Sequence, residues 1–288
     1  MKIRFIINPK AGTGKQQGIE IYIAKNFHDY EIFYTKESGD AVKISKDAVE
    51  KKVNTVIAVG GDGTVNECLS SLINTNTALG VIPCGSGNGF AYHIGMSKII
   101  KNSIKQLKNS HIDTIDTCSV NNMVFANVSG IGFDAHIAKL FSQNKKRGAL
   151  SYIRLILKEL KYKAETYNIN YDGIIKEVEA YMISFANTSQ YGNNAKISPM
   201  SDINDGLIDF VIVKNFPKWK LPIFLFLLFR GKLHLSKYIE IIQSKMMKIT
   251  SQNTLIHLDG ETYKAKNPLT INILEKSLKI LQPNEKKQ

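Results

Sequence analysis

The sequence predicts an α/β domain with a doubly wound sheet, followed by a mainly antiparallel β-sandwich domain. In the first third, short apolar runs alternate with helical patterns and are followed by glycine-rich loops. After about Asp116 the apolar segments become short, alternate in polarity and are separated by turn residues. A chain of 288 residues is long enough for two cores. We place the domains at residues 1–118 and 119–288, with a return of the last residues to the first domain as an open alternative.

The first domain is expected to alternate strands and helices. Its predicted strands cover Ile3–Ile7, Tyr30–Tyr34, Thr55–Val59 and Leu79–Ile82. Its predicted helices cover Gln16 to Asn26, Asp40 to about Lys51, and a stretch that begins at Val65. Ligands of a doubly wound sheet bind outside the carboxyl ends of its strands. The glycine-rich loops that follow Val59 and Ile82 therefore mark the expected binding edge.

The second domain is expected to be built from short strands with two helical interruptions. The strands are predicted at Met123–Val128, Tyr167–Tyr171, Glu177–Asn187, Leu207–Val213, Lys245–Ser251, Thr254–Leu258 and Leu269–Ile273. The helices are predicted at Ala149–Lys163 and Leu221–Phe229, and the nine apolar residues of the second are too few to span a bilayer. Two interpretations of Leu221–Phe229 remain open, a helix lying in a membrane interface and a helix packed in a domain interface.

The loop Gly60-Gly61-Asp62-Gly63-Thr64 carries the clearest chemical signal. It lies between a predicted strand and a predicted helix, where glycines leave backbone amides uncovered and the helix N-terminus attracts phosphate. A carboxylate in this position would repel phosphate unless Mg²⁺ lies between them or Asp62 handles a proton. The combination indicates phosphoryl transfer from a nucleotide. A plain tight turn would explain the glycines but not Asp62 together with Thr64.

The charge of the chain predicts an anionic partner. Basic residues exceed acidic ones by 13, and no acidic residue occurs between Asp209 and Glu240. The basic residues form two groups, Lys214, Lys218, Lys220, Arg230, Lys232 and Lys237, and Lys139, Lys145, Lys146, Arg147, Arg154, Lys158, Lys161 and Lys163. No nucleic-acid-binding module is recognisable, so we expect peripheral contact with an anionic membrane surface and no nucleic acid. Solvated lysines without a partner are the alternative interpretation.

Cysteine usage and the N-terminus predict a cytoplasmic protein. Cys68, Cys84 and Cys118 are scattered without metal-site spacing, which is typical of reduced thiols. The apolar stretch at the N-terminus is too short for a secretory signal. The expected location is the cytoplasm with peripheral membrane association, and the oligomeric state is left open, with a homodimer among the options.

Six motifs together resemble a known family. They are Asn8-Pro9-x-Ala11-Gly12-x-Gly14, Gly60-Gly61-Asp62-Gly63-Thr64-x-Asn66-Glu67, Pro83-x-Gly85-Ser86-Gly87-Asn88, Asn127-Val128-Ser129-Gly130-Ile131-Gly132-Phe133-Asp134-Ala135, Asn204-Asp205-Gly206-Leu207-Ile208-Asp209 and Leu258-Asp259-Gly260-Glu261. In this order the chain resembles the bacterial lipid kinases that share the diacylglycerol kinase catalytic domain. Sphingosine kinases belong to the same superfamily, and NAD kinase is related to it.

The resemblance implies an ATP- and Mg²⁺-dependent lipid kinase whose active site lies in the cleft between the two domains. The implied acceptor is diacylglycerol, which would give phosphatidic acid or a related lipid. Glu261 is implied as the base that takes the hydroxyl proton, and Asp62 as the partner of the catalytic metal. A structural Mg²⁺ is implied at Asp205, with backbone oxygens near Asp202 and Leu207. The implied ATP-binding residues are Asn8, Thr35, Gly60, Gly61, Asp62, Gly63, Thr64, Val65, Asn66, Gly85 and Ser86.

Several alternatives remain open at this stage. Gly89 and Tyr92 replace an aspartate and an arginine that many family members carry, and the second glycine loop is closer to that of sphingosine kinases. A sphingoid base is therefore an alternative acceptor, and a weakly active lipid-binding regulatory protein is an alternative function. NAD kinase is disfavoured by the motifs around Asp134 and Asp205. Asp259-Gly260 taken alone would predict only a type I′ hairpin turn.

Overall fold

The computed structural model describes residues 2–144 and 148–284, apart from residues 13 and 15, and divides the chain into two compact units. Unit 1 contains the chain up to Ile115 together with the segment from Lys276, and unit 2 contains Asp116–Glu275. The N-terminal and C-terminal segments of the chain thus belong to the same unit. Lys145, Lys146 and Arg147 of the second basic group lie outside the described residues.

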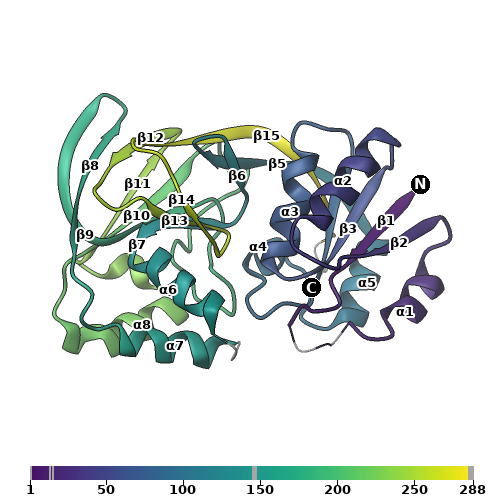
Figure 1. Ribbon diagram of the computed structural model, residues 1–288, viewed down its shortest axis with the longest axis horizontal. Helices are drawn as coiled ribbons and strands as arrows, with labels where there is room; N and C mark the ends of the chain where they lie inside the picture. The colour runs from purple at the N-terminus through teal and green to yellow at the C-terminus, as the bar shows by residue number, and fades with distance from the viewer. Residues whose placement is uncertain (1, 13, 15, 145–147, 285–288) are drawn as a thin grey trace. The chain divides into compact units, whose positions relative to one another are not determined.

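Unit 1 is built on a parallel sheet with the strand order β15-β4-β3-β1-β2, in which β3, β1 and β2 are seen side by side in Figure 1. Its strands are β1 (Ile3–Ile7), β2 (Tyr30–Tyr34), β3 (Thr55–Gly60), β4 (Ala78–Pro83) and the end of β15 (Leu269–Pro283). Its helices are α1 (Ile19–Asn26), α2 (Asp40–Glu50), α3 (Asp62–Leu72), α4 (Gly89–His93) and α5 (Ile100–Lys108). Helices α2 and α3 pack together, as do α1 and α5. The predicted doubly wound architecture is confirmed.

The end of β15 is held in unit 1 by hydrogen bonds as well as by its parallel pairing with β4. Asn74 donates its backbone N–H to the carbonyl of Ser277 at 2.7 Å, and Lys279 Nζ donates to Asn76 Oδ1 at 2.8 Å. The predicted strand Leu269–Ile273 is therefore only the first part of a longer element. Polar residues Glu275 and Lys276 interrupt the apolar alternation that the sequence pattern depends on.

Unit 2 is a mainly antiparallel assembly organised around the long strand β9 (Ile174–Ala186). Its first half pairs with β8 (Glu165–Tyr171), and its second half pairs with β7 (Val128–Gly132) and β10 (Ile208–Lys214). The remaining strands are β5 (Ser110–Val120), which begins in unit 1, β6 (Met123–Phe125), β11 (Ile239–Ser244), β12 (Met246–Thr250), β13 (Leu255–Leu258), β14 (Glu261–Lys264) and the start of β15. The predicted sandwich-type domain is confirmed.

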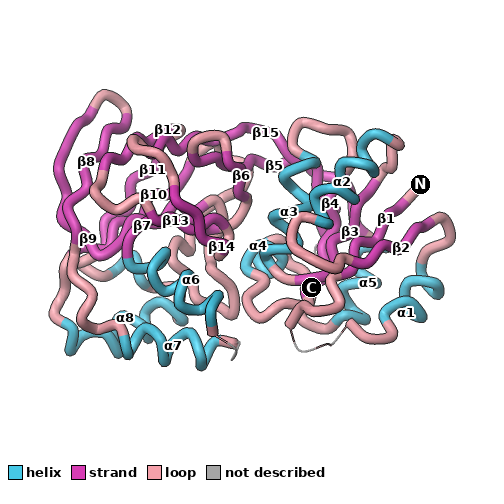
Figure 2. Tube along the Cα trace, in the orientation of Figure 1, coloured by secondary structure: helices cyan, strands magenta, loops and turns pink. Residues whose placement is uncertain are grey.

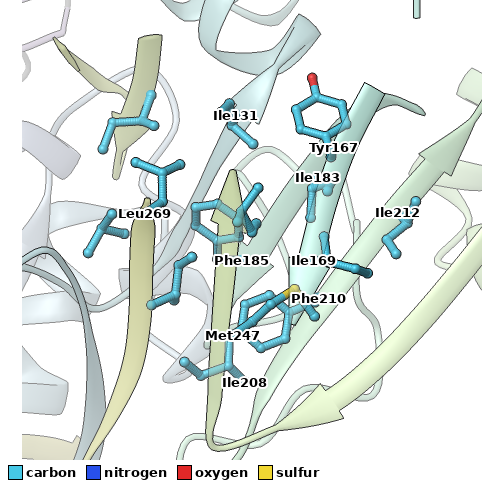
Figure 3. Packing of buried hydrophobic residues seen from close by; sticks show 14 of the residues in the cluster. Ile131, Tyr167, Ile169, Ile183, Phe185, Ile208, Phe210, Ile212, Met247 and Leu269 are labelled. Atoms are coloured by element: carbon cyan, nitrogen blue, oxygen red, sulfur yellow. The ribbon is translucent and has the colours of Figure 1, made fainter. Parts of the chain in front are cut away.

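The strands of unit 2 enclose one large apolar core. Phe185 and Phe210 lie at its centre with their ring centroids 5.9 Å apart (Figure 3). Every second side chain of β8 and β12 enters this core, as period-two burial requires. Burial of such aromatic and aliphatic side chains is the main favourable contribution to the stability of the unit.

The described residues of unit 2 also form three helices and two short 3₁₀ turns. They are α6 (Phe133–Gln143), α7 (Ala149–Lys158), η1 (Lys218–Lys220), α8 (Leu221–Phe229) and η2 (Leu233–Leu235). Figure 2 shows α7 and α8 along one edge of the unit, away from the hairpin of β8 and β9. The limits of α8 match the sequence prediction, whereas α7 is shorter than predicted and α6 was not predicted. No helix in the described part of the chain is long and apolar enough to cross a membrane.

A buried arginine joins the first elements of unit 1. Arg4 in β1 is 1% exposed, and its guanidinium bonds Glu31 Oε2 at 2.8 Å and Asp47 Oδ2 at 2.6 Å. Hydrogen bonds from Lys2 and then Arg4 lower the pKa of Glu31, and the bond from Arg4 lowers the pKa of Asp47. Arg4 thereby ties β2 and α2 to β1.

Replacing Arg4 with Met should make the stability of the protein less dependent on pH. Carboxyl groups whose pKa is lowered by folding stabilise the folded state above their ordinary pKa, and this contribution disappears as the pH falls through the lowered pKa values. Arg4→Met should therefore melt at a lower temperature than the wild type at pH 7, with the difference shrinking toward pH 2–3. Thermal unfolding across this range measures the effect, and a difference that stays constant with pH would contradict it.

Candidate active site

Three loops meet at the carboxyl ends of the strands of unit 1. The loops follow β1, β3 and β4, and their backbones approach so closely that side chains do not fit between them. A Cβ atom on Gly12 would lie 1.9 Å from the carbonyl oxygen of Cys84, and one on Gly85 would lie 2.4 Å from the Cα of Gly61. Gly12 also has a φ of +59°, which glycine adopts without strain. The predicted glycine loops thus form one continuous backbone surface, which we call the glycine cradle (Gly12, Gly61 and Gly85).

Asp62 and Asn88 fasten two loops of the glycine cradle to each other. Asp62 Oδ2 accepts a hydrogen bond of 2.7 Å from the backbone N–H of Asn88. The Asn88 side chain accepts from the N–H of Gly85 at 2.9 Å and donates to the Gly85 carbonyl at 2.7 Å. It also donates to the hydroxyl of Tyr92 at 3.0 Å. Sequence reasoning gave Asp62 a metal-binding role, and the structure adds a role in holding the loops.

The predicted nucleotide-binding residues gather at the same edge. Asn8 Nδ2 donates to Thr64 Oγ1 at 3.2 Å, and the backbone N–H of Thr35 donates to the carbonyl of Ile7 at 3.0 Å. Helix α3 begins at Asp62, and its N-cap residue Gly61 makes no side-chain cap. Val65 is 4% exposed, so its side chain belongs to the core. The residues at this edge are Asn8, Thr35, Gly60, Gly61, Asp62, Gly63, Thr64, Asn66, Gly85 and Ser86.

The geometry of this edge fits a nucleotide phosphate. The N-terminus of α3 carries the positive end of a helix dipole, and the glycine cradle leaves backbone in place of side chains. The Asp62 carboxylate is next to this surface, where Mg²⁺ would balance its charge against phosphate. The residues of unit 1 therefore fit both ATP and its metal.

Glu67, the last residue of the motif that begins at Gly60, has a structural role that the sequence reasoning missed. Its carboxylate accepts hydrogen bonds from the backbone N–H groups of Gly39 at 2.9 Å and Ala41 at 3.2 Å, and from the hydroxyl of Ser38 at 3.1 Å. These groups lie at the N-terminus of α2, where backbone N–H groups lack helical partners. Glu67 therefore caps α2 from α3.

In unit 2, Glu261 stands at the end of a tight hairpin turn. Leu258 in β13 pairs with Glu261 in β14, and the two turn residues, Asp259 and Gly260, have φ angles of +49° and +95°. The Asp-Gly turn considered from the sequence is therefore present, and Glu261 is its first strand residue. Glu261 is exposed, and within the described chain no hydrogen bond or ion pair engages its carboxylate.

The Asp259 side chain fixes this turn to the loop before β7. Asp259 Oδ1 accepts from the backbone N–H of Asn127 at 2.9 Å, and Oδ2 accepts from that of Ala126 at 3.1 Å. Asp259 as a whole residue is 7% exposed. Two charge-assisted bonds to backbone groups fix the position of the turn, and with it the Cα of Glu261.

A buried polar cluster is connected to the same hairpin through His257. Asp134 Oδ2 accepts hydrogen bonds from Ser184 at 3.0 Å and Tyr191 at 3.2 Å, and His257 Nε2 lies 3.3 Å from the same oxygen. His257 Nδ1 accepts from the N–H of Gly260 at 3.3 Å, so the cluster reaches the turn before Glu261. Burial is the main cause that raises the pKa of Tyr191 well above its usual value. Sequence reasoning treated His257 as incidental, because its spacing indicates no metal site.

The predicted structural metal site is an acidic loop between β9 and β10. Asp205 Oδ1 accepts from the N–H of Leu207 at 2.9 Å, and Asp202 Oδ1 accepts from the N–H of Asn204 at 3.0 Å. The pKa of Asp205 is raised first by burial and then by the charges of Asp202, Asp209 and Asp116. A cation near these carboxylates would relieve this repulsion, and carboxylate oxygens are ligands that Mg²⁺ prefers. No cluster of three acidic, histidine or cysteine side chains that could hold a metal occurs in the described residues, so backbone carbonyls or water would have to complete the site.

Comparison with known proteins assigns the family. The sequence profile of the diacylglycerol kinase catalytic domain matches residues 2–120, and that of the YegS C-terminal NAD kinase beta sandwich-like domain matches residues 127–282. The chain belongs to the diacylglycerol kinase family of lipid kinases. The two matches cover both halves of the molecule, including the cradle and the Glu261 hairpin.

Individual relatives match along nearly the whole chain. The diacylglycerol kinase of Bacillus subtilis (strain 168) is 27% identical over 99% of this chain and 97% of its own length. A protein of Shewanella frigidimarina (strain NCIMB 400) named "Probable lipid kinase YegS-like" is 26% identical over 98% of this chain and 94% of its own. A solved diacylglycerol kinase from Bacillus anthracis str. Sterne has the same fold, with a TM-score of 0.75 at 24% identity over 98% and 96% of the two chains. The protein is thus a lipid kinase, and kinases of this family use ATP.

Gly85→Ala should weaken nucleotide binding by forcing two loops apart. Overpacking of a close contact typically costs about 1–3 kcal/mol of unfolding free energy, and here the displaced atoms line the cradle. Calorimetric titration with Mg-ATP should show reduced affinity. Gly18→Ala is the matched control, because Gly18 has a φ of +73° but open space around it. The control should lose stability and keep its ATP affinity; normal ATP affinity of Gly85→Ala would contradict the cradle.

Proposed function

We propose that this kinase transfers the γ-phosphoryl group of ATP to the hydroxyl of diacylglycerol and so forms phosphatidic acid or a closely related lipid. The observation that carries the proposal is the glycine cradle at the N-terminus of α3, which provides a backbone surface for phosphate. Relatives named diacylglycerol kinase that match almost the entire chain support the choice of acceptor.

Unit 1 would bind and orient the nucleotide. Asn8, Thr35 and Ser86 would contact ATP from three loops, while Gly60–Asn66 and Gly85 would supply backbone groups to its phosphates. Asp62 would hold Mg²⁺, which, when bound, neutralises phosphate charge. Most of the rate of such a reaction comes from positioning and electrostatic stabilisation. The rigid fastening of Asp62 to Asn88 serves this positioning.

Glu261 would take the proton from the acceptor hydroxyl. An alcohol is a poor nucleophile, and a placed carboxylate assists its attack on phosphorus. Glu261 suits this role because its carboxylate is exposed and has no partner among the described residues, whereas Asp259 is committed to two backbone N–H groups. The proton would move from the hydroxyl to Glu261 as the oxygen attacks the γ-phosphorus and ADP leaves.

A sphingoid base is the second candidate acceptor. The observation that favours it is the second glycine loop, whose sequence is closer to that of sphingosine kinases. In this loop Gly89 begins α4, and the hydroxyl of Tyr92 accepts a hydrogen bond from Asn88.

Transfer of labelled phosphate from ATP should be measured with vesicles that contain diacylglycerol, with sphingosine and with NAD. Labelled phosphatidic acid as the main product supports the proposal, and preferential labelling of sphingosine or NAD contradicts it.

Glu261→Gln should lower kcat about 10²–10⁴-fold, the usual effect of removing a general base. The substitution keeps the size of the side chain, so the melting temperature and the affinity for Mg-ATP should stay close to those of the wild type. Glu179→Gln is a suitable control, because Glu179 is an exposed residue of β9 away from the turn. Near-normal turnover by Glu261→Gln would exclude this base.

Asp205→Ala should remove the stabilisation of the protein by Mg²⁺ in the absence of nucleotide. A ligand that binds only the folded state stabilises it by about 2.7 kcal/mol at a hundred times its dissociation constant. The wild type should therefore melt at a higher temperature as Mg²⁺ is added, and Asp205→Ala should not. Asp113→Ala is the matched control, since Asp113 also bonds a nearby backbone N–H. A wild type indifferent to Mg²⁺ would refute the structural metal.

A further inference from the structure

Helix α8 is apolar on all sides, but only one side is used by the core of unit 2. Phe224, Leu227 and Leu228 pack against a buried cluster that includes Val211 and Leu233. One side of the helix is therefore packed within unit 2. Packing in the core explains why these three residues are apolar. It does not explain why the residues on the opposite side of the helix are apolar too.

The opposite side of α8 and its flanks expose large apolar side chains to solvent. Phe226 is 62% exposed and Ile223 is 55% exposed, and they are one helical turn apart. Trp219 in η1 is 72% exposed and Leu235 in η2 is 67% exposed. We call these four residues the docking face. Helix α8 contacts both η1 and η2, so these exposed side chains lie on neighbouring elements, and groups of exposed apolar side chains usually mark a contact surface.

Local contacts give the docking face a defined shape. The ring of Phe216 stacks on that of Phe224 with centroids 4.8 Å apart. Lys220 Nζ lies 5.1 Å from the centre of the Trp219 ring and donates to the hydroxyl of Tyr238 at 3.2 Å. Lys218 Nζ donates to the carbonyl of Leu160 and, at 3.4 Å, to that of Tyr162. Lys218 precedes Trp219 in η1 and thereby joins this turn to the segment after α7, where Leu160 is also exposed.

The chain segment that carries the docking face is rich in positive charge. The segment from 210 to 239 contains no aspartate or glutamate, and its six basic residues are Lys214, Lys218, Lys220, Arg230, Lys232 and Lys237. The nearest acid along the chain, Glu240, is engaged by Lys214 at 2.8 Å and Lys176 at 2.5 Å. The exposed Arg154, Lys158 and Lys161 lie on or just after α7. A second copy of the chain would bring the same charges to this surface and be repelled.

We propose that the docking face inserts into the headgroup region of an anionic lipid bilayer. Tryptophan and phenylalanine favour this region, and basic side chains on a short apolar helix pair with anionic headgroups. Nine residues are too short to cross the bilayer, so α8 would lie in its surface. This contact goes beyond the phosphoryl-transfer proposal, and it holds whichever lipid accepts the phosphate.

The fluorescence of Trp219 tests the contact directly, since this is the only tryptophan of the chain. Vesicles with 30% phosphatidylglycerol should shift its emission to shorter wavelength, and brominated lipids should quench it. The shift should weaken with salt, because exposed charges are screened over about 10 Å at 0.1 M, and with vesicles of phosphatidylcholine alone. Unchanged emission at all lipid concentrations would overturn the proposal. A blue shift that depends on protein concentration without lipid would overturn it in favour of self-association.

A pair of substitutions separates docking from catalysis. Ile223→Ser combined with Phe226→Ser should weaken vesicle binding at least tenfold and lower phosphorylation of vesicle-embedded diacylglycerol. Phosphorylation of a short-chain, water-soluble diacylglycerol should be unchanged. Ile175→Ser is the matched control, because Ile175 is 75% exposed but precedes Glu177 and Glu179. Equal vesicle binding by all three proteins would overturn the docking face. Inactivity of the wild type on both lipids, with docking intact, would count only against the proposed function.

Discussion

The close approach of backbones in the glycine cradle is the constraint on which the candidate nucleotide site depends. Gly61 and Gly85 lie so near each other that a single Cβ atom would require the loops to separate. Separation would also break the hydrogen bond between Asp62 and Asn88, which closes the same gap. A steric requirement and a polar one therefore act at one place, and both hold the start of α3 beside the loop after β4. The proposed phosphate-binding edge follows from this arrangement.

Most acidic side chains of the family motifs accept hydrogen bonds from backbone N–H groups and so hold loops in place. Asp62 accepts from Asn88, Glu67 caps α2, and Asp259 accepts from Ala126 and Asn127. Each of these carboxylates fixes a loop through charge-assisted bonds to N–H groups. Glu261 differs, since its carboxylate is exposed and uncommitted within the described chain. The proposed role of Glu261 in proton transfer is compatible with this difference, because the neighbouring Asp259 already holds the turn in place.

The sequence predicted best those elements whose pattern of apolar residues or turn residues lies within one short stretch of the chain. Strands Ile3–Ile7 and Tyr30–Tyr34 and helix Leu221–Phe229 were predicted with the limits that the structure has, and the Asp-Gly turn weighed as an alternative is present. Helix α6 was not predicted, because its start overlaps a glycine-rich motif that resembles a loop. The cluster of Asp134 and His257 could not be predicted either, since β7, β9 and β13 must pair before these residues meet. Long-range pairing of this kind leaves no pattern in a single sequence.

The orientation of α8 shows how packing decides a property that the sequence leaves undetermined. Its residues are nearly uniform in polarity, so periodicity cannot indicate which side faces outward. The outward side is fixed by Phe224, Leu227 and Leu228, whose burial against Leu233 and Val211 sets the rotation of the helix about its axis. Ile223 and Phe226 are exposed as a consequence. A bilayer contact at this surface would therefore depend on the core of unit 2, since a change in core packing that rotates the helix would also change the side chains offered to lipid.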